Sequence, residues 1–180
     1  ELRLGRPEPL DEAVNSIYYL NELLLETVPE VLAQFKNEVK RLGVDLSLTA
    51  RPLSFGTWIG GDRDGNPNIT AEVTKAAILL QNSHFIRTVS EHLDELKQSL
   101  SISTKLAGVS AELEKSVSQD LEKLPEIENR YRRINVEEPY RLKATAIGHK
   151  LALTQTRHTN GLPHFPGRDY KDTAELLSAF

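Results

Sequence analysis

Residues 10–42 form a long amphipathic stretch, which reads LDEAVNSIYYLNELLLETVPEVLAQFKNEVKRL. Its apolar residues recur at the three- and four-residue spacing of one helix face. Pro9, Asp11 and Glu12 suit the first turn of a helix, where a fixed φ and negative charge are favoured. Pro29 has no amide hydrogen to donate, so it should kink or divide the helix. This stretch therefore predicts long helices.

The same helical spacing of apolar residues returns several times along the rest of the chain. Thr70 and Ser110 suit the N-cap position of further helices. Helices are expected at about residues 71–100, 111–124, 127–134 and 139–157, with a loop over 158–167 and a final helical turn from 172 or 173. Only residues 51–59 alternate apolar and small or polar side chains, as a strand does. The predicted fold class is mostly α, with long helices and one short strand.

Composition excludes several classes of protein. The chain has 180 residues, no Cys, 39% hydrophobic and 27% charged residues, and a net charge of −4. That balance is typical of a folded domain rather than a disordered chain. Without Cys there is no disulfide framework, thiolate nucleophile or Cys-based zinc site. We expect a cytoplasmic protein with no membrane and no nucleic-acid partner, because long apolar runs are lacking and the basic clusters are short.

One segment stands out as a site for chemistry, the glycine-rich turn after the expected strand. Residues 55–67 read FGTWIGGDRDGNP. Glycines allow a positive φ or a close backbone approach, and Asp and Asn accept backbone N–H bonds in turns. Arg63 lies between two carboxylates, where its guanidinium could grip an anion or brace the loop. Both interpretations, an anion site and a tight turn with internal ion pairs, are open on these residues alone.

Three known loop types do not fit this turn. A Walker loop requires Gly-Lys followed by Ser or Thr, which is lacking. Asp62, Asp64 and Asn66 have the spacing at which an EF-hand calcium loop begins. However, Pro67 stands at the sixth place of that loop and Val73 at the twelfth, where Gly and Glu are needed. The two adjacent glycines also do not supply a dinucleotide-binding fingerprint.

The loop closely resembles the F-x-S-W-M-G-G-D-R-D-G-N-P motif of phosphoenolpyruvate carboxylases. Residues 1–4, Glu-Leu-Arg-Leu, resemble the end of the family's T-D-E-[LI]-R segment. Residues 138–141, Glu-Pro-Tyr-Arg, with 148–151 after them, resemble its E-P-Y-R…R-x-K-L helix. Departures are small: Thr57 replaces Ser, Ile59 replaces Met, and Gly148-His149 stands where Val-Arg-Asp is frequent.

The resemblance implies an enzyme that makes oxaloacetate and phosphate from phosphoenolpyruvate and bicarbonate with Mg²⁺ or Mn²⁺. Family members are helix-rich homotetramers built around an eight-stranded β/α barrel, to which residues 53–59 are expected to contribute. The family's loop tryptophan lines a CO₂ pocket, and it matches Trp58. The resemblance places the whole loop at the mouth of the active site. The site residues it implies are Trp58, Gly60, Gly61, Asp62, Arg63, Asp64 and Asn66.

Two arginines resemble residues of an effector site in the family, which binds a sugar phosphate in plant members. They are Arg3 and Arg141, and other metabolites act as effectors in bacterial members. The family's upstream T-A-H-P-T and downstream G-Y-S-D-S-x-K motifs are lacking, and no Asp/Glu pair matches its metal ligands. The histidines lack metal-site spacing and are expected at the surface or at caps: His84, His92, His149, His158 and His164.

We therefore expect residues 1–180 to form a single helical segment of a larger enzyme, with helices on either side of the strand and loop at 51–67. Such a segment should be inactive alone and, because its apolar strand lacks cover, prone to self-association. The alternative is a non-enzymatic helical module in which the loop binds an anion or a protein.

Overall fold

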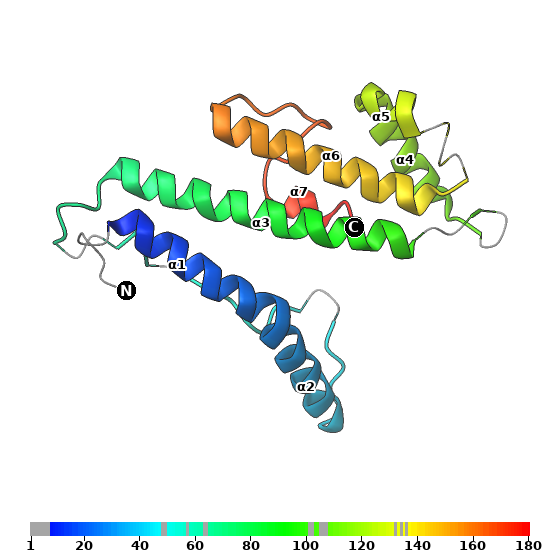
Figure 1. The fold of residues 1–180 in the computed structure, drawn as a ribbon. Coiled ribbons are helices and arrows are strands. Elements are labelled where there is room, and N and C mark those ends of the chain that lie inside the picture. The colour runs from blue at the N-terminus through cyan, green and yellow to red at the C-terminus, as the bar shows by residue number, and fades with distance from the viewer. Residues whose placement is uncertain are drawn as a thin grey trace. The chain divides into compact units, whose positions relative to one another are not determined.

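The computed structural model describes residues 8–47, 50–56, 58–62, 65–100, 103–104, 108–131, 133, 135 and 137–180. The chain is mostly helical, which confirms the predicted class. Its elements, in order, are α1 (Pro9–Glu22), the π-helix η1 (Leu23–Thr27), α2 (Val28–Arg41), α3 (Ala71–Ser99), α4 (Ala111–Lys123), α5 (Pro125–Tyr131), α6 (Pro139–Asn160) and α7 (Thr173–Leu177). Figure 1 labels the seven α-helices.

The predicted strand is wrong for the part of residues 51–59 that the structure describes. Residues 51–56 and 58–59 are irregular, and the β pairing found among the described residues is an isolated bridge between Pro166 and Asp169. Alternating side chains suit a strand, but a strand also needs a neighbour to accept and donate its backbone hydrogen bonds. No described segment offers one to residues 51–56.

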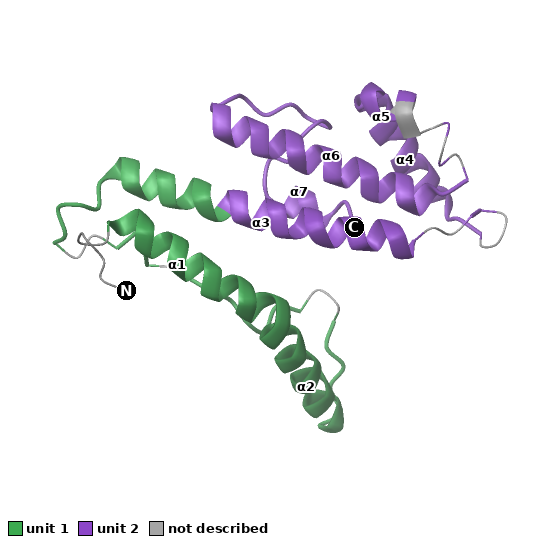
Figure 2. Cartoon of the chain, viewed as in Figure 1, with its two compact units in different colours: residues 1–81 green, residues 82–180 purple. Residues whose placement is uncertain are grey.

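Contacts divide the chain into two compact units, residues 1–81 (unit 1) and residues 82–180 (unit 2) (Figure 2). The boundary falls inside α3. Unit 1 therefore holds α1, η1, α2, the irregular segment with the glycine-rich loop, and the first part of α3. Unit 2 holds the second part of α3 and all later helices.

In unit 1, α1, η1 and α2 follow one another without a gap. The predicted effect of Pro29 takes the form of a widened turn, in which the amide of Val28 donates to the carbonyl of Leu23. This turn immediately precedes Pro29, whose missing amide hydrogen leaves the regular four-residue pattern incomplete there. α2 ends at Arg41, and Gly43, two residues later, has a φ of 80° and donates its amide to the carbonyl of Lys40 at 3.0 Å.

The N-caps predicted from the sequence are present at several helices. The Thr70 hydroxyl accepts the amide of Val73 at 3.3 Å, and the Ser110 hydroxyl accepts the amide of Leu113 at 3.2 Å. These bonds satisfy amides that have no partner inside the helix. The α3 cap also fixes the point at which the glycine-rich loop ends.

Unit 2 contains most of the buried apolar side chains. Its larger cluster joins α3, α6, the segment before α7 and α7 itself, and consists of Ile86, Leu93, Ala144, Ile147, Leu151, Tyr170 and Leu176. A smaller cluster joins α4, α5 and α6 through Leu124, Ile127 and Ala146. Among the residues that the structure describes, no helix is long and apolar enough to cross a membrane.

Candidate functional site

The glycine-rich loop forms a tight turn after Trp58. The carbonyl of Trp58 accepts two backbone hydrogen bonds, from the amide of Gly61 at 3.0 Å and from the amide of Asp62 at 2.8 Å. Gly60 lies at the centre of this turn with a φ of 77°, a conformation that favours glycine. Thr57, Arg63 and Asp64 lie outside the described residues, so the predicted roles of Arg63 and Asp64 stay predictions.

Gly60 also touches the first part of α3. A Cβ atom built on Gly60 would lie 2.6 Å from the Cβ of Ala77 and 3.8 Å from the carbonyl oxygen of Val73. Ala77 is 2% exposed, so this approach is covered from solvent. Both its backbone conformation and its surroundings therefore require glycine at position 60.

A second turn closes the loop at Asn66. The side-chain oxygen of Asn66 accepts the amide of Asn68 at 3.0 Å, and its carbonyl accepts the amide of Ile69 at 3.2 Å. Such a bond from a side chain to the backbone two residues on is typical of Asn in turns. Asn66 thus shapes the loop directly before α3.

The turn and the start of α1 enclose a small hollow of about 110 Å³. Trp58, Gly60, Asp62 and Asn66 of the predicted site line it. Its other lining residues are Pro9, Glu12, Ile59, Asn68 and Ile69. The hollow can hold water or a small molecule, since one water needs only about 10–15 Å³ of volume measured in this way.

Glu12 and Pro9 were not predicted as part of this site. The sequence marks them only as the first turn of a helix, and their nearness to the loop depends on how the chain folds back. The predicted residue Gly61 is held by the turn but does not line the hollow. The structure thus brings together four of the predicted loop residues and adds two from α1.

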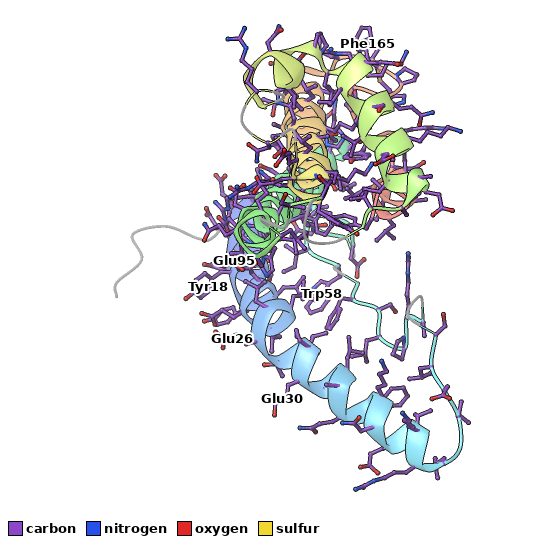
Figure 3. All side chains as sticks on the ribbon, turned by 90° about the vertical axis from the view of Figure 1, so that its right-hand side faces the viewer. Tyr18, Glu26, Glu30, Trp58, Glu95 and Phe165 are labelled. Carbon is purple, nitrogen blue, oxygen red and sulfur yellow. The ribbon has the colours of Figure 1, made fainter. Side chains whose placement is uncertain are left out.

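Trp58 is not a core residue of this chain. It lies on the irregular segment rather than on a helix (Figure 3), and 73% of its surface is exposed. An exposed tryptophan leaves a large apolar surface in water, which costs free energy unless another surface or ligand covers it. The exposed indole is therefore available to another surface or to a ligand.

Comparison with known proteins identifies the origin of this loop. The family model of phosphoenolpyruvate carboxylase matches residues 1–180. The chain belongs to the phosphoenolpyruvate carboxylase family. A phosphoenolpyruvate carboxylase of Prochlorococcus marinus (strain MIT 9215) is 33% identical over 163 residues, and that of Roseiflexus castenholzii is 33% identical over 155 residues. Phosphoenolpyruvate carboxylase 4 of Arabidopsis thaliana is 42% identical over 102 residues.

These alignments cover 88%, 86% and 56% of this chain and 16%, 16% and 10% of the respective carboxylases. The chain therefore spans about a sixth of the length of the bacterial carboxylases it matches. Family membership confirms the resemblance found in the loop and does not favour a separate binding module.

The predicted effector residue Arg141 lies on the first turn of α6 in unit 2. Its Nη1 atom donates to the carboxylate of Glu138 at 3.0 Å, and the same Glu138 oxygen accepts the side-chain amide of Asn135 at 2.9 Å. The Arg141 side chain is 33% exposed. Arg3 lies outside the described residues, so the pairing of the two arginines at one phosphate stays a prediction.

The histidines of this carboxylase segment take several environments. His149 bonds the carboxylate of Glu126 at 2.9 Å, as a surface residue does. His84 and His158 differ from the prediction, because each has one buried ring nitrogen without a hydrogen-bond partner in the described part of the chain. Burial and a neighbouring arginine lower the pKa of both rings. No group of three His, Asp or Glu side chains within the described residues could hold a metal ion.

A polar cluster at the end of α6 was not predicted. The carboxylate of Asp169 accepts from His164 Nδ1 at 2.5 Å and from the amide of Phe165 at 3.0 Å, and Arg157 Nε lies 3.2 Å away. Burial opposes the charge on Asp169, but these partners together hold the pKa of its carboxyl below the usual value. Through the contact between Arg157 and Asp169, the cluster holds the segment after α6 against that helix. Its residues follow no recognisable sequence spacing.

Proposed function

We propose that this chain supplies an active-site loop to a phosphoenolpyruvate carboxylase, which converts phosphoenolpyruvate and bicarbonate into oxaloacetate and phosphate. The observation that carries the proposal is the exposure of Trp58 beside a small hollow, on a loop that matches the family motif. The resemblance implies that bicarbonate first attacks the phosphate, giving carboxyphosphate and an enolate. Carboxyphosphate then releases CO₂, which the enolate captures.

Trp58 supplies an apolar wall for the CO₂ in this proposal. CO₂ needs few polar contacts, whereas water must be kept from the enolate and from carboxyphosphate until the new carbon–carbon bond has formed. The indole offers a large apolar face, and the turn formed by Gly60 and Gly61 holds the backbone that carries it. Asn66 contributes by shaping the end of the loop.

The other partners of the proposed enzyme lie beyond this chain. A bound Mg²⁺ or Mn²⁺ would polarise the enol oxygen in such a reaction, and its ligands are expected outside this chain, because the resemblance matches no Asp/Glu pair here to the family's metal ligands. The isolated chain is therefore expected to be inactive. The proposed parent is a homotetramer with a β/α barrel, and Arg3 and Arg141 are proposed effector residues.

Substitution of Trp58 in the full-length enzyme tests the proposal. Trp58→Ala should lower oxaloacetate formation by about 10²-fold, the loss expected when a reacting molecule is misplaced. The use of bicarbonate should weaken more than the binding of phosphoenolpyruvate, and Trp58→Phe should recover part of the loss.

Tyr19→Ala provides a matched control. Tyr19 is an aromatic residue on α1 that is 66% exposed and does not line the hollow. Its removal should leave oxaloacetate formation close to that of the unchanged enzyme. A full-length Trp58→Ala enzyme with unchanged kcat and unchanged KM for bicarbonate would contradict the proposal.

A further inference from the structure

Gly60, two residues from Trp58, approaches α3 closely. At Gly60 a Cβ atom would meet the Cβ of Ala77 at 2.6 Å, whereas ordinary contact begins at about 3.4 Å. The Cβ of Ala77 is attached directly to the α3 backbone, so it has no rotamer by which to move away. The contact therefore joins the backbone of the loop to the backbone of α3.

We propose that Ala77 is a positioning residue, whose methyl group sets the distance of Gly60 from α3 and thereby the place of the Trp58 side chain. The inference rests on the proposed role of Trp58 in carboxylation. Ala77 itself does not line the hollow, so it acts on the site only through Gly60.

The turn links the backbone of Gly60 to that of Trp58, so a shift of Gly60 should also shift Trp58. The carbonyl of Trp58 accepts hydrogen bonds from the amides of both Gly61 and Asp62, at 3.0 and 2.8 Å, so residues 58–62 form one hydrogen-bonded turn. Trp58 is 73% exposed, so few packing contacts fix the position of its indole ring. Its position therefore depends on the backbone that carries it, and Gly60 is where that backbone meets α3.

The size of Ala77 is the critical quantity. A larger side chain at position 77 would enter space that Gly60 occupies, and overpacking at a buried site displaces the backbone. A Cβ at Gly60 requires a shift of the same kind, because its separation from Ala77 must increase from 2.6 Å to about 3.4 Å. Misplacement of a reacting group by about 1 Å can cost about 10²-fold in rate.

The test measures oxaloacetate and phosphate separately in the full-length enzyme. When Trp58 is displaced, CO₂ escapes and the enolate takes a proton from water. Phosphoenolpyruvate and water then give pyruvate and phosphate, and the CO₂ returns to bicarbonate. We expect Ala77→Val and Gly60→Ala to lower the oxaloacetate formed per phosphate released by about tenfold, within the range that misplacement produces.

Two matched controls separate position from stability. Gly43 has a φ of 80° and no atom within 4 Å of a built Cβ, so Gly43→Ala adds backbone strain without a clash. Ala76→Val makes the same exchange as Ala77→Val one residue earlier on α3. Both controls should keep the oxaloacetate-to-phosphate ratio of the unchanged enzyme, because a loss of folded molecules lowers both products equally.

A compensating pair keeps the test decisive if Ala77→Val does not fold. Ala77→Gly removes the methyl group that a Cβ at position 60 would meet. The double variant Gly60→Ala, Ala77→Gly should therefore form more oxaloacetate per phosphate released than Gly60→Ala alone. It should not reach the ratio of the unchanged enzyme, because alanine at position 60 is still strained by the positive φ. Recovery supports the positioning role.

Two results would overturn the inference. One is a product ratio that stays unchanged in Ala77→Val and Gly60→Ala while total activity falls, and the other is no recovery in the compensating pair. In both cases Trp58→Ala would still be impaired. If Trp58→Ala itself keeps full carboxylation, the proposed function of the loop fails instead, so the two failures are distinguishable.

Discussion

Asp120 on α4 shares its carboxylate between two lysines of α6. Lys143 Nζ lies 2.8 Å from one carboxylate oxygen and Lys150 Nζ lies 2.5 Å from the other. The three side chains are 9%, 14% and 12% exposed. Lys143 also donates to the hydroxyl of Ser116 at 2.7 Å. Because these charges are largely removed from water, each needs the others to offset the cost of burial.

Removal of the Asp120 charge should strongly destabilise the chain. Asp120→Asn leaves two buried ammonium groups without a counter-charge, and we expect the free energy of unfolding to fall by about 3–5 kcal/mol. Urea unfolding followed by circular dichroism measures this. Asp94→Asn is the matched control, because Asp94 pairs with Lys97 at 2.7 Å but is 69% exposed. An exposed pair contributes about 0–1 kcal/mol, so equal losses in the two variants would contradict the argument.

The candidate site shows which residues a sequence can identify. Trp58, Gly60 and Asn66 were predicted because the loop itself has a recognisable order of residues. Glu12 and Ala77 were not predicted, because their relation to the loop arises only when α1 and α3 come beside it. A helix pattern assigns them to a first turn and to a buried face, and neither assignment indicates a site.

The helices were predicted well because the sequence signals that start and stop a helix are local. Thr70 and Ser110 cap the helices that were predicted to follow them, and the side chain of Asp172 accepts the amide of Glu175 at the start of α7. The strand predicted at residues 51–59 was wrong for the part that the structure describes, because the pairing of a strand depends on a distant segment. The end of α6 was placed too early, at Arg157, whereas the helix continues to Asn160 and ends at Gly161.

Gly161 ends α6 in the left-handed conformation, with a φ of 62°. No atom lies within 4 Å of a Cβ built there, so backbone conformation alone requires glycine. Gly161→Ala should lower the free energy of unfolding by about 1–2 kcal/mol, the cost of the left-handed region for a residue with a Cβ.

Gly161→Asn is the comparison variant, since Asn tolerates this conformation better. Its loss should be smaller than that of Gly161→Ala in the same urea measurement. If the alanine variant were as stable as the original chain, the positive φ would not be what ends the helix.

The two units differ in which apolar side chains they bury. Of the apolar residues buried in the described chain, unit 1 contributes Ala13 and Ala77, and unit 2 contributes all the large ones. Tyr18, Leu23, Phe35, Phe55 and Trp58 are exposed large side chains of unit 1. Such a surface is typical of a segment that another surface covers. This supports the prediction that the isolated chain self-associates.

The stability of unit 2 should depend on pH through two partly buried histidines. Arg87 Nη2 contacts His84 Nδ1 at 2.8 Å, and Arg157 Nη2 contacts His158 Nε2 at 3.1 Å. In each pair the ring nitrogen is the acceptor, so the ring is neutral and its proton lies on the buried nitrogen without a partner in the described chain. Burial and then the arginine charge hold the pKa of each ring below its ordinary value of 6.5.

The sign of the effect follows from proton binding. Below about pH 6.5 the unfolded chain takes up protons at these two rings that the folded chain does not, which favours unfolding. The urea midpoint should therefore be constant above pH 7 and fall as the pH decreases from 6.5 toward 5. The double variant His84→Gln and His158→Gln should show a smaller decrease over this interval, since glutamine does not titrate. An equal decrease in the variant would mean that other groups control the acid sensitivity of unit 2.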